Sequence, residues 1–187
     1  MSQIKIILIR HGEAENKWGE HPDPGLSLKG ISESYDLLKH KELQSLEDYF
    51  FISSPKLRAI ETAKPLAKKF NKKVKIDNCF IEIPAEGIKP DKKQEWLEQI
   101  VQTNKKELPM FIKNWKNKIL NKIKKLDRNT IIFSHFMVIN ALLSELTDID
   151  TLLYFYPGHT SVVTLEMKNK EFDYFITEGN KKTAINL

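Results

Sequence analysis

The stretch Ile4-Lys5-Ile6-Ile7-Leu8-Ile9-Arg10-His11-Gly12-Glu13 decides how the rest of this chain is interpreted. Its first six residues form a short, mainly β-branched run before a glycine turn, which is typical of a buried strand. A guanidinium and an imidazole follow at the strand's carboxyl end, the edge at which open α/β sheets bind ligands. Arginine matches phosphate oxygens, histidine can attack or donate, and glycine lets backbone approach an anion closely. The stretch therefore indicates phosphoryl chemistry.

Arginine is used sparingly in this chain. Lysine and arginine together number 30, and only Arg10, Arg58 and Arg128 are arginines. Because arginine offers a rigid, planar fork that lysine lacks, its selective use marks positions where lysine would not serve. We expect Arg10 and Arg58 to bind phosphate.

Length and composition predict one globular domain over residues 1–187, since 41% of the residues are hydrophobic and 29% are charged. No stretch approaches the ~20 apolar residues that span a bilayer, and the first strand begins without a targeting segment. The single Cys79 excludes an internal disulfide and a cysteine-based zinc site. We expect a soluble, cytoplasmic protein with no membrane partner.

The formal charge of +5 and the pI near 9.1 raise the question of nucleic acid. Six lysines lie on one predicted helix, at Lys113, Lys116, Lys118, Lys122, Lys124 and Lys125. Apolar residues recur between them at helical spacing, so the pattern favours the solvated face of a docked helix over a nucleic-acid interface. Nucleic-acid binding through this helix is the competing interpretation.

Hydrophobic periodicity predicts alternating strands and helices. Strands are expected at 4–9, 49–53, 74–76, 129–134, 161–167 and 171–176, with a turn at 168–170, and helices at 30–46, 54–70, 95–101, 109–126 and 139–146. Pro65 should kink or split its helix. The alternation indicates an α/β fold, a three-layer α/β/α sandwich around a mostly parallel central sheet.

Two predicted strands each end in a histidine, His11 and His135. If the strands are parallel, their carboxyl ends meet at one edge and the two imidazoles face the same pocket. Arg58 would join them from the helix that follows a third strand, and the N-terminal turn of that helix could also attract an anion.

Taken together, these segments resemble the histidine phosphatase superfamily, also called the phosphoglycerate mutase-like superfamily. The resemblance rests on four motifs in the family's order, at Arg10-His11-Gly12-Glu13-Ala14-Glu15-Asn16, Asp23-Pro24-Gly25-Leu26-Ser27-Leu28-Lys29-Gly30, Ser54-Pro55-Lys56-Leu57-Arg58-Ala59-Ile60-Glu61-Thr62-Ala63 and Ser134-His135. It extends from the first strand to Ser161 and implies a phosphoglycerate mutase-like fold.

The resemblance implies that His11 attacks phosphorus, forms a phosphohistidine and is released by water. Arg10, Arg58 and a protonated His135 would stabilise the phosphoryl oxygens without a metal or another cofactor, and Asn16 would be a further donor.

A carboxyl group should protonate the leaving group. The resemblance points to Glu82, in Phe80-Ile81-Glu82, and apolar neighbours could raise its pKa as this role requires. Glu86 is the competing candidate. The family's usual glycine and aromatic residues after the acid are absent, so the alternative that neither carboxyl is catalytic stays open.

Phe136-Met137 replaces the pair of small residues that commonly follows the second histidine in the family. If these side chains turn inward, they would make the pocket narrower or more apolar. His21, His40 and His159 are expected to be incidental.

We expect a small-molecule phosphomonoesterase. The alternatives are a phosphoglycerate mutase, which the modest segment between Glu82 and Asn129 disfavours, a phosphohistidine-protein phosphatase, and a non-catalytic phospholigand-binding module. Such a module would be expected to lose His11, Arg58 or His135, and this chain keeps all three.

Overall fold

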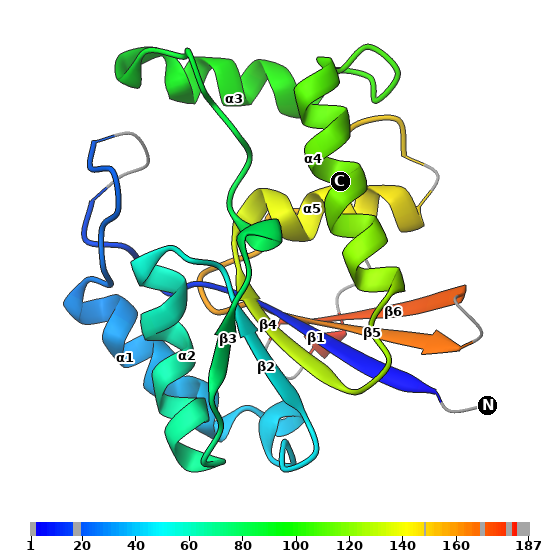
Figure 1. The fold of residues 1–187 in the computed structure, drawn as a ribbon. Coiled ribbons are helices and arrows are strands. Elements are labelled where there is room, and N and C mark those ends of the chain that lie inside the picture. Colours follow the sequence, from blue (N-terminus) through cyan, green and yellow to red (C-terminus); the bar gives the residue numbers. More distant parts are fainter. Residues whose placement is uncertain (1–2, 17–19, 148, 169–170, 179–180, 183–187) are drawn as a thin grey trace.

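Figure 1 shows the fold, a computed structural model that describes residues 3–16, 20–147, 149–168, 171–178 and 181–182. Within these residues, seven strands form one sheet, and they are β1 (Ile4–Arg10), β2 (Phe50–Ser53), β3 (Val74–Ile76), β4 (Thr130–Ser134), β5 (Val162–Lys168), β6 (Glu171–Glu178) and β7 (Lys181–Lys182). The α-helices in the described residues are α1 (Leu28–Asp36), α2 (Leu57–Lys69), α3 (Lys93–Gln102), α4 (Met110–Lys124) and α5 (Phe136–Leu146).

The strands lie in the order β3-β2-β4-β1-β5-β6-β7. The pairs β3–β2, β2–β4 and β4–β1 are parallel, whereas β5 runs antiparallel to β1 and β6 antiparallel to β5. Strands β1, β2, β3, β4 and β6 therefore point the same way, and their direction confirms the α/β class. The antiparallel β5 pairs with β1, and β6 and β7 extend the sheet beyond it.

The alternating side chains of β1 build two separate cores. Ile7 and Ile9 belong to an apolar cluster with residues of α2, whereas Ile6 and Leu8 belong to a second cluster with residues of α4 and α5. Because side chains alternate across a strand, this division places α1 and α2 on one face and α3, α4 and α5 on the other (Figure 1). The three-layer arrangement predicted from the sequence is present.

The boundaries of two predicted helices were wrong. The helix expected at 30–46 is α1, which ends at Asp36 and gives way to 3-10 turns at Leu37–Lys39 and Lys41–Leu43. It starts early because the Ser27 hydroxyl caps it by accepting the Gly30 N–H at 3.0 Å.

The helix expected to start at Ser54 begins only at Leu57. The Ser54 N–H still donates to the carbonyl of Phe133, so the chain follows the sheet past the end of β2. Helix α2 then runs unbroken through the buried Pro65, which does not split it. Residues 169–170 of the expected turn between β5 and β6 lie outside the described residues.

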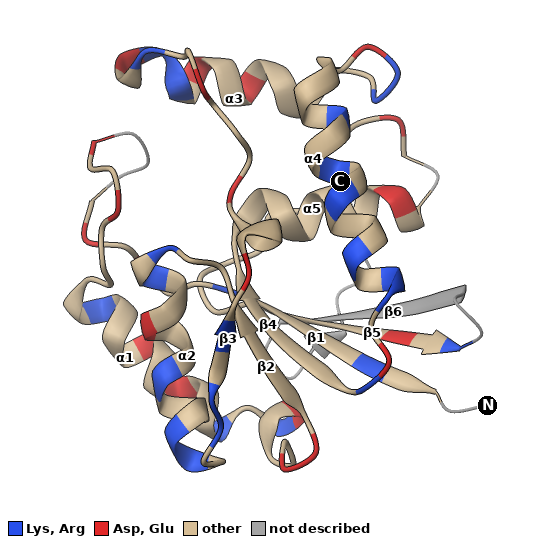
Figure 2. Ribbon diagram, in the orientation of Figure 1, with Lys and Arg blue, Asp and Glu red and all other residues tan. Residues whose placement is uncertain are grey.

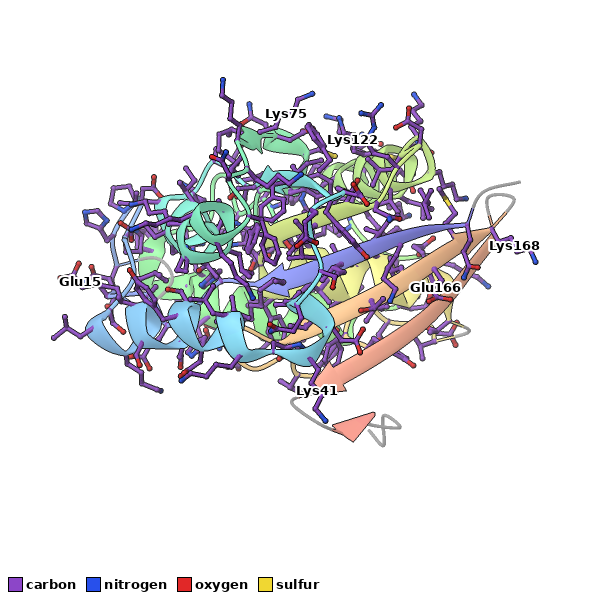
Figure 3. The ribbon with its side chains drawn as sticks, turned by 90° about the horizontal axis from the view of Figure 1, so that it is seen from below. Glu15, Lys41, Lys75, Lys122, Glu166 and Lys168 are labelled. Carbon is purple, nitrogen blue, oxygen red and sulfur yellow. The ribbon has the colours of Figure 1, made fainter. Side chains whose placement is uncertain are left out.

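The lysines of α4 are partly engaged within the molecule. Lys116 is buried with its Nζ 2.6 Å from a Glu145 carboxylate oxygen, and Lys122 lies 2.7 Å from Asp77. Figure 2 shows blue and red segments of the ribbon spread over the helices and loops. In Figure 3, labelled charged residues such as Lys41, Lys75 and Lys168 lie at the periphery. These contacts agree with a docked helix that has a solvated face.

Candidate active site

The carboxyl ends of β1, β2 and β4 bring distant segments together at one edge of the sheet. Arg10 stands opposite Ser134, and Ser53 stands opposite Phe133. The next residues continue this register, since the His11 N–H donates to the Ser134 carbonyl at 3.0 Å. Parallel pairing therefore delivers the residues that follow each strand to the same place.

Three side chains from these segments form the His–Arg cluster, defined as His11, Arg58 and His135. Arg58 Nε donates to His11 Nε2 at 3.1 Å, and Arg58 Nη2 lies 3.3 Å from His135 Nδ1. The two imidazole centroids are 5.1 Å apart, and all three residues are buried. The guanidinium thus bridges the two rings that the sequence places 124 positions apart.

The hydrogen bonds fix the form of His11. Its Nδ1 lies 2.7 Å from the Gly12 carbonyl, so this nitrogen carries the proton and donates, while Nε2 has the lone pair that accepts from Arg58. The Gly12 N–H donates to the Thr62 hydroxyl at 3.0 Å, so it does not serve as the anion contact expected from the sequence. Nε2 is consequently the ring nitrogen of His11 that has the lone pair.

The surroundings of both histidines favour the neutral imidazole. Burial lowers the pKa of His11 well below its ordinary value, and the positive charge of Arg58 lowers it further. Burial, followed by His11 and Arg58, likewise lowers the pKa of His135. A protonated His135 was expected from the sequence. In the structure, its Nε2 lies 2.7 Å from the Ser54 hydroxyl and its Nδ1 faces the Arg58 guanidinium, a cation that disfavours a second positive charge.

Arg10 approaches the cluster from β1. Its Nη1 donates to the Pro157 carbonyl at 2.7 Å, while Nε is buried and has no hydrogen-bond partner among the described residues. An unsatisfied buried donor is costly, and more so when it is charged. Arg10 therefore has a donor available for an anion.

Glu82 lies against the first turn of α5. Its Oε1 accepts the N–H of Ile83 at 2.9 Å and that of Met137 at 3.1 Å. Burial of the carboxyl raises its pKa, although these two N–H groups and the charges of Arg58 and Arg10 act in the opposite direction. A raised pKa and an Oε2 with only a longer contact to Met137, at 3.5 Å, suit a group that carries a proton.

The other candidate residues are not gathered into the cluster. Glu86 is exposed next to Gly87, and Asn16 is exposed in the loop after β1 without a hydrogen bond to the His–Arg cluster. The first amide of α2, on Leu57, is already occupied because it donates to the Asp23 carboxylate at 3.0 Å. That amide is not free to bind an anion as the sequence suggested.

The Phe136-Met137 pair divides between the site and the core. Met137 is fully buried in the apolar cluster on the α4 and α5 side of the sheet. The Phe136 ring instead lies under the Arg10 guanidinium, with 5.3 Å between Cζ and the ring centroid. Of the two side chains, only that of Phe136 therefore contacts the site, whereas Met137 contributes its backbone N–H, which donates to Glu82.

Sequence reasoning missed two residues beside the cluster. Ser54 contacts His135, and His159 lowers the pKa of His11 through its charge. His159 Nδ1 also lies 3.7 Å from a Glu33 carboxylate oxygen. The position of Ser54 directly after β2 was a signal for its location, whereas nothing near His159 in the sequence indicated its proximity to the site.

Among the described residues, no group of three or more histidine, cysteine or carboxylate side chains could hold a metal ion. Within the same residues, no helix has the length and apolar character needed to cross a membrane.

Comparison with known proteins supplies independent information. The model of the histidine phosphatase superfamily (branch 1) matches residues 6–175, and no curated protein sequence matches this chain. Among solved structures, the chain is similar to phosphoserine phosphatase from Entamoeba histolytica in complex with 3-phosphoglyceric acid, with a TM-score of 0.74, 22% identity and coverage of 95% of this chain and 97% of that chain.

It is also similar to a mycobacterial glucosyl-3-phosphoglycerate phosphatase in complex with VO3, with a TM-score of 0.70, 16% identity and coverage of 95% and 99%. A third similar structure is mycobacterial hydrolase 1, with a TM-score of 0.70, 14% identity and coverage of 97% and 100%. These likenesses show a shared fold.

Proposed function

Since the chain belongs to the histidine phosphatase superfamily (branch 1), we propose that it is a metal-independent phosphatase that hydrolyses small phosphomonoesters through a phosphohistidine on His11. The observation that carries this proposal is the Arg58 bridge between His11 Nε2 and His135 Nδ1. A nucleophilic nitrogen and its cationic partner lie side by side, in a buried setting where electrostatic interactions are strong.

In the first step, the substrate phosphate takes the place of His11 as acceptor of the Arg58 Nε–H. This exchange frees the Nε2 lone pair, which attacks phosphorus as the P–O bond to the leaving group breaks. Arg10 and Arg58 neutralise the phosphoryl oxygens, and the bound dianion favours protonation of His135. The Gly12 carbonyl, which accepts from Nδ1, stabilises the positive charge that develops on the His11 ring.

Glu82 supplies the proton for the leaving oxygen. Its Oε2 carries that proton, because Oε1 already accepts two backbone N–H groups. After the alcohol leaves, the Glu82 carboxylate takes a proton from water as the water oxygen attacks phosphorus. The P–N bond breaks, its electron pair returns to His11 Nε2, and inorganic phosphate is released.

A phosphoglycerate mutase and a phosphohistidine-protein phosphatase would use the same nucleophile. The raised pKa of Glu82 favours hydrolysis of esters with basic leaving groups, since an acid is needed only when the departing oxygen requires a proton. A non-catalytic phospholigand-binding module would have no use for a protonated carboxyl beside the phosphate site.

The test is a hydrolysis screen in chelator over sugar phosphates, phosphoglycerates, nucleotides and phosphohistidine, with His11→Ala in parallel. We expect phosphate release by the wild type without added metal, and a loss of at least about 10³-fold in His11→Ala. The exposed His21 provides a matched control, because His21→Ala should keep the activity. Activity that required added metal, or that survived in His11→Ala, would refute the mechanism. Isomerisation of phosphoglycerate faster than its hydrolysis would favour the mutase.

A further inference from the structure

An aromatic pair, the half-buried Phe136 and the exposed Tyr156, lies next to the His–Arg cluster. The rings of Phe136 and Tyr156 have centroids 5.9 Å apart, and Tyr156 is 70% exposed. The tyrosine ring therefore presents a large apolar surface to solvent, and burial of such a surface against a ligand is favourable.

Arg10 connects this pair to the phosphate-binding groups. Its guanidinium lies over the Phe136 ring, and its Nη1 is held by the carbonyl of Pro157, the residue that follows Tyr156. On the other side, Phe136 directly follows His135 of the cluster. A phosphate held by Arg10 and the cluster would thus lie at the base of the aromatic pair.

Glu82 determines the direction in which the alcohol part of the substrate extends. The Met137 N–H holds the Glu82 carboxyl, so the proton donor lies one residue beyond Phe136 on α5. The bridging oxygen must come within hydrogen-bond distance of Glu82 to receive its proton. The alcohol part is therefore directed along the first turn of α5, past Phe136.

We propose that Phe136 and Tyr156 form an aromatic wall for the leaving group and make the enzyme selective for phosphomonoesters of aromatic alcohols. This inference rests on the proposed phosphatase function. Flat rings pack against aromatic faces in offset or edge-to-face geometry. A polyol at the same place would exchange water for ring faces that are poor hydrogen-bond partners.

The test compares 2-phenylethyl phosphate with glycerol 1-phosphate. Both leaving groups are alkoxides of similar basicity, so a difference in kcat/KM reports contacts with the alcohol part and not the ease of bond cleavage. We expect the wild type to prefer 2-phenylethyl phosphate. Inhibition by phosphonates measures binding without turnover, and benzylphosphonate should inhibit more strongly than ethylphosphonate.

Tyr156→Ser should lower the ratio of kcat/KM for 2-phenylethyl phosphate to that for glycerol 1-phosphate by about three- to tenfold, as expected for loss of one aromatic contact. Tyr156→Phe should keep the ratio. The matched control is Tyr35→Ser on α1, because Tyr35 is also exposed, at 58%, and should leave the ratio unchanged.

The outcomes separate the two proposals. If the wild type hydrolyses both esters equally well, or if Tyr156→Ser leaves the ratio of their kcat/KM values unchanged, the aromatic wall is refuted and the phosphatase function stands. If the wild type hydrolyses neither ester nor any member of the wider screen, the phosphatase function fails. Stronger inhibition by ethylphosphonate than by benzylphosphonate would also overturn the wall.

Discussion

Nε2 of His11 combines two roles that compete with each other. Nε2 is the ring nitrogen that has a lone pair, and in this structure the lone pair accepts a hydrogen bond from Arg58. Burial and the neighbouring cation lower the pKa of the ring, which favours a neutral Nε2. In the proposed mechanism, the same cation must turn to the phosphate before Nε2 can attack.

The role of Glu82 can be tested with the isosteric change Glu82→Gln. Loss of the proton should lower kcat/KM for alkyl phosphates by about 10²–10⁴-fold, and much less for p-nitrophenyl phosphate, whose leaving group is stable as an anion. Steady-state kinetics on both substrates measures the difference. Glu86→Gln is the matched control, since Glu86 is exposed. Equal losses on both substrates in Glu82→Gln would exclude the role as an acid.

The buried histidines also predict how stability depends on pH. Unfolded histidine takes up a proton near pH 6.5, whereas the folded pKa values of His11 and His135 are lowered. The unfolded state therefore binds more protons, and the free energy of unfolding should fall as pH falls below about 6.5. Glu82 opposes this trend, because its raised pKa keeps a proton on the folded state.

His135→Gln should flatten that dependence by up to about 1.4 kcal/mol per pH unit, which corresponds to one proton. Urea unfolding between pH 5 and 7.5 gives the measurement. His21→Gln serves as the control, because His21 is exposed and should leave the slope unchanged. A slope in His135→Gln identical to that of the wild type would show that His135 is not held neutral.

At the level of elements, the loop after β1 crosses α1 at two glycines. A methyl group on Gly12 would lie 2.7 Å from the Gly30 carbonyl oxygen, and one on Gly30 would overlap the Glu13 carbonyl oxygen. The Glu13 N–H also donates to the Glu33 carboxylate on α1, at 2.7 Å. This close crossing holds the residues that follow His11.

Gly30→Ala should destabilise the protein by about 1–3 kcal/mol, although alanine is the better helix former, because the crossing backbones leave no room for the methyl group. Chemical denaturation measures the change. Gly158→Ala is the control, since its methyl group would meet the Ser161 Oγ at 3.5 Å, an ordinary contact, and should change stability by no more than about 0.5 kcal/mol. An equal effect of both substitutions would contradict the crossing.

The elements also show what the sequence could and could not predict. The β-branched runs identified β1 and β4 because they are local patterns, and parallel pairing then followed from the alternation of strands and helices. The early start of α1 depends on a serine cap and the late start of α2 on the sheet hydrogen bond of Ser54, and hydrophobic periodicity contains neither signal.

The same limit applies to the site. His11, Arg58 and His135 stood in motifs at strand ends or at the start of a helix, so their meeting could be expected. The contact of Phe136 with Arg10 and the position of His159 could not, because each depends on how a loop far along the chain returns to β1.

At the scale of the whole molecule, the sheet brings segments that are far apart in the sequence together at one site. Arg10 ends β1 and His11 follows it, Arg58 lies in the first turn of α2 after β2, and His135 directly follows β4. Two apolar clusters on opposite faces hold the strands in register, so the relative positions of these side chains are set by the core. Under the proposed function, this assembly exists to carry a phosphoryl group on His11.

The most direct test of that claim is a rapid-quench experiment with a ³²P-labelled phosphomonoester in chelator. We predict a transient phosphoprotein that is stable in alkali and labile in acid, as expected for a P–N bond, with the label mapped to the peptide containing His11. The label should be absent in His11→Ala and accumulate more slowly in Arg58→Ala. Labelling that persists in His11→Ala, or substrate turnover without any labelled histidine, would contradict the account.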